Sequence, residues 1–269
     1  MAGKTRKLKS PDYVIAIPSY KRSDILKEKT LATLHKYKIP KEKIYVFVAS
    51  KEEHDIYKES LDLSMYGHLI IGVPGLAAVR NFISGYFPKG KKIVSCDDDI
   101  RGFIEFDETK KRHEKELVSL KAVIERGFKE CAAKGANLWG LYPSANGFFM
   151  KDTVNYDLKF IIGNFFGYIN FKNERKLTVT TGPKDDYERS LLFYKEDGVI
   201  VRLNFVAAKT SIYTTPGGLQ DGNRLARVKA DVEGLMKKYP DYVFPNPRRK
   251  GPFPEITIKD TKKIEKSFR

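Results

Sequence analysis

Cysteine is scarce in this sequence of 269 residues, since only Cys96 and Cys131 occur. Two cysteines cannot build a disulfide framework, and neither lies at a spacing typical of a zinc site. Cys96 falls inside an apolar run, which favours a buried free thiol. Histidine is also scarce, and none of the four forms a pair at helical metal-ligand spacing. We therefore interpret the histidines as surface or core residues.

Long hydrophobic runs are missing as well. No stretch of 18 or more apolar residues occurs, which argues against a membrane span. The segment from Met1 to Lys9 is basic but lacks the apolar stretch and cleavage site of a signal peptide. A soluble, cytoplasmic protein is therefore the expectation. The length and a hydrophobic content of 41% allow one large α/β domain or two small ones.

Acidic residues are the minority among the charged ones. Lys and Arg total 50 against 34 Asp and Glu, which gives a net charge of +16. Such an excess favours polyanionic partners, namely nucleic acid, an acidic membrane surface or phosphorylated substrates. Residues 236–269 alone carry 10 Lys and Arg against 4 Asp and Glu, and a solvated tail is the alternative interpretation of this segment.

The first half of the sequence alternates short apolar runs with amphipathic stretches. Strands are predicted at 13–17, 44–48, 68–72 and 93–96, and helices at 25–37, 52–60 and 76–86. This alternation predicts a parallel sheet with right-handed crossovers. Ligands of such sheets bind at the carboxyl ends of the strands.

The second half has a looser pattern. Helices are predicted at 117–134, 187–195 and 223–238, and β structure at 137–142, 160–162, 165–171 and 199–206. From Pro240 onward, prolines alternate with basic residues, which indicates an extended tail on the surface or a partly disordered one. The aromatic residues Phe148, Phe149, Phe165 and Phe166 are expected in the core.

Three consecutive carboxylates, Asp97, Asp98 and Asp99, follow the fourth apolar run. Crowded like charges repel, so the cluster is costly unless a cation neutralises it. A hard cation such as Mg²⁺ or Mn²⁺ prefers carboxylate oxygens together with substrate phosphates. In an extended segment Asp97 and Asp99 project to the same side and can share one metal site, while Asp98 points away. The alternative is a solvated acidic turn.

Four ordered motifs carry a resemblance to a known family. The segments AIPSYKR (16–22), VFVA (46–49), GLAAVRN (75–81) and VSCDDD (94–99) resemble the nucleotide-binding half of family-2-type GT-A glycosyltransferases. They are more specifically similar to the phage and kinetoplastid group that glycosylates hydroxymethylated pyrimidines in DNA. The resemblance implies a Rossmann-like mixed sheet between helices. It divides the chain into a glycosyltransferase domain at 1–240, with a nucleotide-sugar half at 12–100 and an acceptor half at 101–240, and a basic extension at 241–269.

The same resemblance implies a donor site for a UDP-sugar and a divalent ion. The loop of Pro18, Ser19, Tyr20 and Arg22 would hold the base, with Tyr20 stacking and Arg22 reaching a phosphate. Ala49 would face the nucleoside, and Arg80 would balance the diphosphate or bond the first carboxylate. Asp97 and Asp98 would contact the nucleotide, and Asp97 and Asp99 would ligate Mn²⁺ or Mg²⁺. An ordinary strand–helix turn and a surface arginine are the alternatives.

A second acidic cluster opens the segment KDDYERSLLFY (184–194), which resembles the acidic pair that carries the general base of the family. Asp186 aligns best with the base, and Asp185 is its neighbour. A simple helix N-cap is the alternative. Gly140, Gly163 and Gly167 would let a sugar or acceptor approach the backbone, and Gly163 is assigned to the donor site. The glycine-rich segment 214–224 would form a lid, with Asp221 as a possible extra metal ligand.

The resulting hypothesis is transfer of a glucose-type sugar, with inversion, to the hydroxymethyl group of a pyrimidine in DNA. Two alternatives stay open on the sequence alone. One is a GT-A glycosyltransferase that acts on a saccharide, lipid or protein. The other is a nucleic-acid-binding module without catalytic activity.

Overall fold

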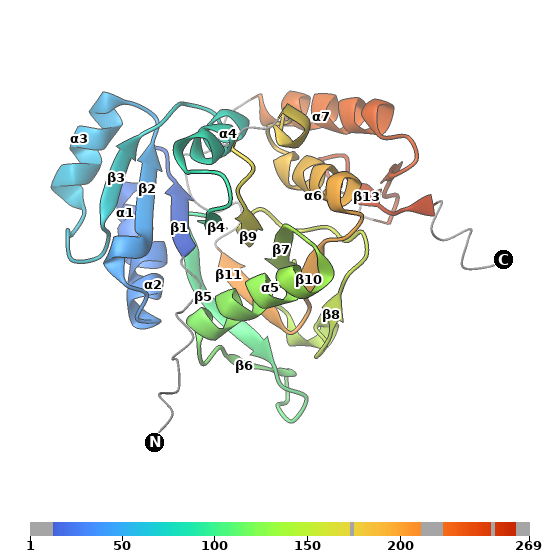
Figure 1. The fold of residues 1–269 in the computed structure, drawn as a ribbon, viewed down its shortest axis with the longest axis horizontal. Coiled ribbons are helices and arrows are strands. Elements are labelled where there is room, and N and C mark those ends of the chain that lie inside the picture. Colours follow the sequence, from blue (N-terminus) through green and yellow to red (C-terminus); the bar gives the residue numbers. More distant parts are fainter. Residues whose placement is uncertain (1–12, 173–174, 211–222, 249–250, 262–269) are drawn as a thin grey trace, which may run out of the picture.

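The computed structural model describes residues 13–172, 175–210, 223–248 and 251–261. Its centre is an eight-stranded sheet in the order β3-β2-β1-β4-β9-β7-β10-β8 (Figure 1). Strands β1 to β4 are mutually parallel, whereas β9 runs antiparallel to β4 and β7. The sheet is therefore mixed, as the resemblance implied. Its strands are β1 (Tyr13–Pro18), β2 (Ile44–Val48), β3 (His68–Ile71), β4 (Lys92–Cys96), β7 (Leu138–Leu141), β8 (Val154–Asn155), β9 (Phe165–Ile169) and β10 (Val201–Leu203).

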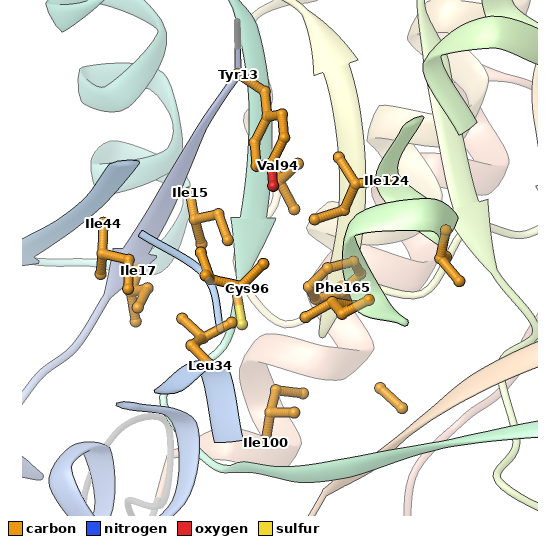
Figure 2. Close-up of a cluster of buried hydrophobic side chains, with 14 of the residues drawn as sticks. Tyr13, Ile15, Ile17, Leu34, Ile44, Val94, Cys96, Ile100, Ile124 and Phe165 are labelled. Carbon is orange, nitrogen blue, oxygen red and sulfur yellow. The ribbon is translucent and has the colours of Figure 1, made fainter. Parts of the chain in front are cut away.

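Helices cover both faces of this sheet, and alternate residues of each strand feed two separate cores. In β1, Ile15 and Ile17 face the core shared with α2 and α5, which Figure 2 shows in close-up. Val14 and Ala16 face the opposite core, which is shared with α4, α6 and α7. The helices are α1 (Ser23–Ile25), a π-helical turn η1 (Leu26–Leu31), α2 (Ala32–Lys36), α3 (Lys51–Ser60), α4 (Leu76–Tyr86), α5 (Leu120–Lys134), α6 (Asp185–Asp197) and α7 (Arg224–Lys238).

Two smaller sheets accompany the main one. The first has the order β11-β5-β6 and the second pairs β12 with β13. The sequence did not predict β5, and the single strand expected at 199–206 is wrong. The chain turns at Asn204, whose amide donates to Thr153 and Asn155, and then enters the other sheet as β11. Their bounds are β5 (Ile100–Phe106), β6 (Glu114–Glu116), β11 (Val206–Thr210), β12 (Val243–Pro245) and β13 (Ile256–Ile258).

The prediction of β structure at 160–162 is also wrong. Residues 160–162 form no strand, and the amide of Ile161 donates to the side-chain hydroxyl of Ser190 on α6 at 3.0 Å instead of joining a sheet. An isolated apolar run of three residues was the only signal, and such a run does not distinguish a strand from a buried loop.

The basic extension is more ordered than an extended tail where the structure describes it. Val243, Ile256 and Ile258 of the β12–β13 pair are buried in the core beneath α6 and α7. Met1 to Lys9, most of the expected lid with Asp221, and residues 262–269 lie outside the described residues. Among the described helices, none combines the length and apolar character needed to cross a membrane.

The expected core position holds for Phe165 and Phe166 but is wrong for Phe148 and Phe149. The latter are 61% and 63% exposed on a short 3₁₀ turn, η3 (Gly147–Phe149). The amide of Gly147 donates to Glu114, and a Cβ on this glycine would lie only 2.3 Å from the carbonyl oxygen of Arg112. This close contact fixes the turn against the β5–β6 hairpin, which leaves both rings outside.

Candidate functional site

The acidic triplet lies at the carboxyl edge of the main sheet. Cys96 ends β4, Asp97 follows it, and Asp98 and Asp99 form a turn that leads into β5. The extended conformation that the prediction assumed for the triplet is therefore wrong, because a turn does not follow the alternation of a strand.

Asp98 points into the protein and joins the end of β4 to the end of β1. Its carboxylate accepts a hydrogen bond of 2.7 Å from the hydroxyl of Ser19 and lies 3.4 Å from the Arg22 guanidinium. Ser19 also shares a hydrogen bond of 2.8 Å with the hydroxyl of Tyr57, which accepts from the Arg22 amide. Burial raises the pKa of Asp98 to about 6, although Ser19 and Arg22 oppose the rise. These contacts fix the predicted base-binding loop against the triplet.

A threonine from the π-helical turn holds the backbone of the triplet. The hydroxyl of Thr30 donates to the carbonyl of Asp97 at 2.7 Å and accepts from the amide of Ile100 at 2.9 Å. Both ends of the acidic turn are thus bound to one buried side chain. Single π-helical turns occur frequently at functional sites, and this one places Thr30 under the carboxylates.

Arg80 contacts both acidic clusters of the site. Its guanidinium bonds the carboxylate of Asp97 at 2.8 Å, the carbonyl of Gly163 at 3.1 Å and the hydroxyl of Ser95. The Nε atom lies 3.7 Å from the carboxylate of Asp185. The surface-arginine alternative is therefore wrong, since the Arg80 side chain is buried and connects the triplet to the second acidic cluster.

The second acidic cluster begins α6. Asp185 is buried and pairs with Arg189 at 2.7 Å, one helical turn later. Asp186 is half-buried, lines a large cleft and accepts a hydrogen bond from the Tyr187 amide at 2.9 Å. Burial, reinforced by the charge of Asp185, raises the pKa of Asp186 to about 7. A carboxyl group with such a pKa can exchange a proton near neutral pH.

The helix-cap alternative holds in part, because the Asp186 carboxylate accepts from the Tyr187 amide in the first turn of α6, although neither aspartate is the N-cap residue. Lys184 occupies the N-cap position of α6, and no side chain caps it by a hydrogen bond. The nearby Glu188 has a structural role instead. It is fully buried, accepts hydrogen bonds from the amides and hydroxyls of Thr180 and Thr181, and pairs with Lys238 at 2.7 Å.

Of the three glycines expected to admit a ligand, only Gly163 lies beside the acidic pair. A Cβ at this position would meet Asp186 and Arg189 at 3.5 Å, in ordinary van der Waals contact. Gly140 and Gly167 instead make room for core side chains, since a Cβ on either would lie 2.3 Å from Ile161 or Trp139. The ligand-access role predicted for those two glycines is therefore not what the packing shows.

The remaining residues that were predicted for the donor site lie along the same edge of the sheet. Pro18 is the last residue of β1, and the ring of Tyr20 beyond it is 41% exposed, with the Lys21 ammonium 5.1 Å from its centroid. Ala49 follows β2 directly and is partly exposed. These positions leave Tyr20 and Ala49 accessible to a nucleoside, whereas Arg22 is already engaged by Asp98.

Asp97 and Asp99 are the predicted metal ligands. Both are partly exposed, and burial raises the pKa of each, against the fields of Arg80 and Arg22 respectively. Within the described residues, no cluster of three or more Asp, Glu, His or Cys side chains could hold a metal on its own. Two carboxylates fit Mg²⁺ or Mn²⁺ bound together with substrate phosphates, because these ions take few protein ligands in such sites.

Several site residues were missed in the sequence. Arg189 could have been found, because it lies four residues after Asp185 on the same helix face. Thr30 and Tyr57 carry no such signal. Thr30 reaches the triplet, and Tyr57 reaches Ser19, only through the packing of η1 and α3 in the fold. Asn164, whose carbonyl accepts from the Asp97 amide at 2.9 Å, likewise depends on the pairing of β4 with β9.

No protein-family model and no curated protein matches this sequence. Solved structures do match in fold. S. aureus TarS 1–349 aligns with a TM-score of 0.50 and 12% identity over 84% of this chain and 65% of that one. The mannosyltransferase PcManGT from Pyrobaculum calidifontis, in complex with GDP-Man and Mn²⁺, aligns with a TM-score of 0.52 and 14% identity over 86% and 66%.

The chain thus spans just under two thirds of the length of these two proteins. At such low identity the likeness establishes the architecture alone. That architecture is the GT-A fold, a mixed α/β sheet flanked by helices, as the resemblance implied.

Proposed function

We propose that this protein is a metal-dependent glycosyltransferase that uses a nucleoside diphosphate sugar. One observation carries the proposal: Arg80 lies between Asp97 of the triplet and Asp185 of the acidic pair. A predicted metal ligand and the neighbour of the candidate base therefore adjoin one guanidinium at the carboxyl edge of a GT-A sheet, where α/β proteins bind their ligands.

The chain's own residues account for the roles that such a transfer needs. Ser19 and Arg22 orient Asp98 beneath the nucleoside, and Arg80 opposes the charge that develops on the leaving diphosphate. Asp186 takes the proton from the acceptor hydroxyl as that oxygen attacks the anomeric carbon. A divalent ion held by Asp97 and Asp99 would supply Lewis-acid stabilisation of the diphosphate. Direct attack assisted by a base inverts the anomeric centre, so an anomer-resolved NMR assay that showed retention would exclude this role of Asp186.

The proposed donor is a UDP-sugar of the glucose type, and the proposed acceptor is a 5-hydroxymethylpyrimidine in DNA. The motifs of the first 100 residues and the charge of +16 support this choice. Such an acceptor would place the enzyme in the cytoplasm, that of the host if the chain is phage-encoded. A saccharide, lipid or protein acceptor is the competing proposal, and GDP-mannose belongs among the donors tested because one structural neighbour binds it.

The test is a panel of nucleotide sugars with Mn²⁺ or Mg²⁺, offered with hydroxymethylated or plain DNA. Nucleoside mass spectrometry should detect a hexose adduct only on the hydroxymethylated DNA. Asp99→Ala should abolish metal-dependent donor turnover, whereas Asp62→Ala, at an exposed aspartate on the loop after α3, should leave it intact. Donor turnover with no adduct on DNA would reject the DNA acceptor, and no turnover of any donor would reject the enzyme.

A further inference from the structure

A cleft of about 1360 Å³ opens beside Asp186. Its walls come from Arg202 of β10, from β5 and β11 of the smaller sheet, from β13, and from the loop before β9 and the start of α6. Since β10 runs parallel to β7, its carboxyl end belongs to the sheet edge that carries the strand-end site. The cleft is larger than a small-molecule site requires, which suits a polymeric acceptor.

Three cations in the cleft walls have a carboxylate partner, and a fourth, Lys259, lies 4.5 Å from the centroid of the Phe244 ring. Lys159 pairs with Asp157 at 2.9 Å and Lys184 pairs with Glu255 at 3.1 Å. Arg112 lies 3.7 Å from Glu114. These pairs belong to the architecture of the walls and leave little net charge for a ligand.

Arg202, Lys209 and Arg101 are different. Across the described part of the chain, none of these three cations has a carboxylate within ion-pair distance, although all line the cleft. Arg202 donates its Nε to Asn204 at 2.9 Å, which leaves the two terminal nitrogens of the guanidinium for another partner. Burial lowers the pKa of Arg202, while Tyr142 and Asp157 oppose the shift. A partly buried guanidinium without a counter-anion is costly, and a bound anion would relieve that cost.

We propose that Arg202, Lys209 and Arg101 form an anion subsite that binds a phosphodiester group of the acceptor. A guanidinium with two free terminal nitrogens matches two phosphate oxygens, and the neighbouring cations add charge without geometric demands. The inference rests on the proposed function, because it assigns the cleft beside Asp186 to the acceptor. It adds that the acceptor carries phosphate near the reacting hydroxyl.

The test measures binding without any donor, so its result does not depend on sugar transfer. The probe is a short fluorescein-labelled single-stranded DNA, and its Kd is read by anisotropy over a range of salt. Arg202→Gln should raise this Kd about ten-fold or more and make the salt dependence shallower by about 0.7 in log–log slope, as expected for one lost phosphate contact. A methylphosphonate oligomer of the same sequence keeps the bases but lacks the charge. Its weak binding should not change in the variant.

Lys159→Gln is the matched control, because it removes the same charge from a cation of the cleft that already has a carboxylate partner. It should change the Kd less than two-fold. Equal losses in Arg202→Gln and Lys159→Gln would overturn the inference, since overall charge alone would then explain binding.

If Arg202→Gln fails to fold, the Kd for the same DNA is measured with Lys209→Gln and Arg202→Lys. Unchanged Kd values in both variants would overturn the inference. Competition by inorganic polyphosphate as strong as that by unlabelled DNA would show that any phosphate polymer is recognised, whereas weaker competition would indicate nucleic acid.

Discussion

The acidic triplet after β4 can be compared with the acidic pair at the start of α6, because both crowd carboxylates at the same edge of one sheet. In each cluster one member is buried and paired. Asp98 contacts Ser19 and Arg22, and Asp185 contacts Arg189 and Arg80. In each cluster another member, Asp99 or Asp186, is more open.

The clusters differ in how the remaining charge is compensated. In the triplet, Asp97 keeps a 2.8 Å ion pair with Arg80 while 36% of its side chain stays exposed. In the pair, Asp186 accepts its described hydrogen bond from a neutral amide, and its pKa is raised to about 7. A partly exposed carboxylate that is ion-paired to an arginine suits phosphate and cation binding, whereas one whose pKa lies near neutral suits proton transfer. This difference agrees with the proposal that the triplet binds the donor and that the pair supplies the base.

The sharpest test separates the two members of the pair. Asp186→Asn should lower kcat/KM for sugar transfer about 1000-fold, because it removes the base. It should not lower the free energy of unfolding at pH 8, because the charge that it removes is itself destabilised by burial. Asp185→Asn should lower the free energy of unfolding by about 3 kcal/mol, since the buried guanidinium of Arg189 loses its carboxylate and that of Arg80 loses one of two.

Steady-state kinetics and denaturant unfolding measure both effects. Asp157→Asn is the control, because this carboxylate also lines the cleft but is 44% exposed and pairs with Lys159. It should remain close to the wild type in both assays. An exchange of the two signatures between Asp185→Asn and Asp186→Asn would reverse the roles given to these residues.

Arg80 connects the two clusters, so its removal should disturb both. Arg80→Met leaves Asp97 and Asp185 without their shared cation and should lower the free energy of unfolding by about 3 kcal/mol, or less because Asp97 keeps access to water. Arg80→Lys retains the charge but loses the fork that reaches three partners, and it should recover only part of the loss. Equal stability of Arg80→Met and the wild type would show that the clusters are not coupled through this residue.

The pH dependence of transfer provides a smaller effect. Since the pKa of Asp186 is raised from about 3.8 to about 7, the group is protonated at low pH, and kcat/KM should rise with pH and level off above about 7. One pH unit below that point the rate should be about ten-fold lower. The contribution of Asp186 to stability has the opposite trend. It is fully present below the unfolded pKa and is lost as the pH rises from about 4 through about 7.

The residual activity of Asp186→Asn is the control for this assignment. It should be flat across the same pH range, because the titrating group is gone. A wild-type profile that stays level between pH 5 and pH 8 would remove Asp186 as the base. Unfolding measured over the same range checks the sign of the stability change.

The first half of the fold was predictable because its signals are local. Strand β2 and helix α4 occur at the predicted residues 44–48 and 76–86, where apolar runs and helical periodicity leave little choice. The second half is set by tertiary contacts. Strand β9 enters antiparallel between β4 and β7, and the chain changes sheets at Asn204. No periodicity within a short window encodes either event.

The site shows the same division. Its acidic residues stood out in the sequence because clustered carboxylates are costly. Their partners could not be identified from the sequence, because Thr30 is 67 residues from Asp97 and Tyr57 is 38 residues from Ser19. Ser19 was placed in the donor site by resemblance, yet its contact with Asp98 became apparent only from the turn that follows β4. The sequence therefore gives no indication of how strongly Ser19, Tyr57 and Asp98 depend on one another energetically.

The smallest expected effect is the loss of stability on removing the hydroxyls of Ser19 and Tyr57, and it tests whether these two groups are coupled. Ser19→Ala removes the hydroxyl shared by Asp98 and Tyr57 and should lower the free energy of unfolding by about 1 kcal/mol. Tyr57→Phe should cost a similar amount. Since the two hydroxyls form one hydrogen bond with each other, the double variant should cost less than the sum of the single ones. Ser64→Ala, at an exposed serine, should change nothing measurable. Strict additivity would mean that the two hydroxyls act independently, so that Asp98 is oriented without help from α3.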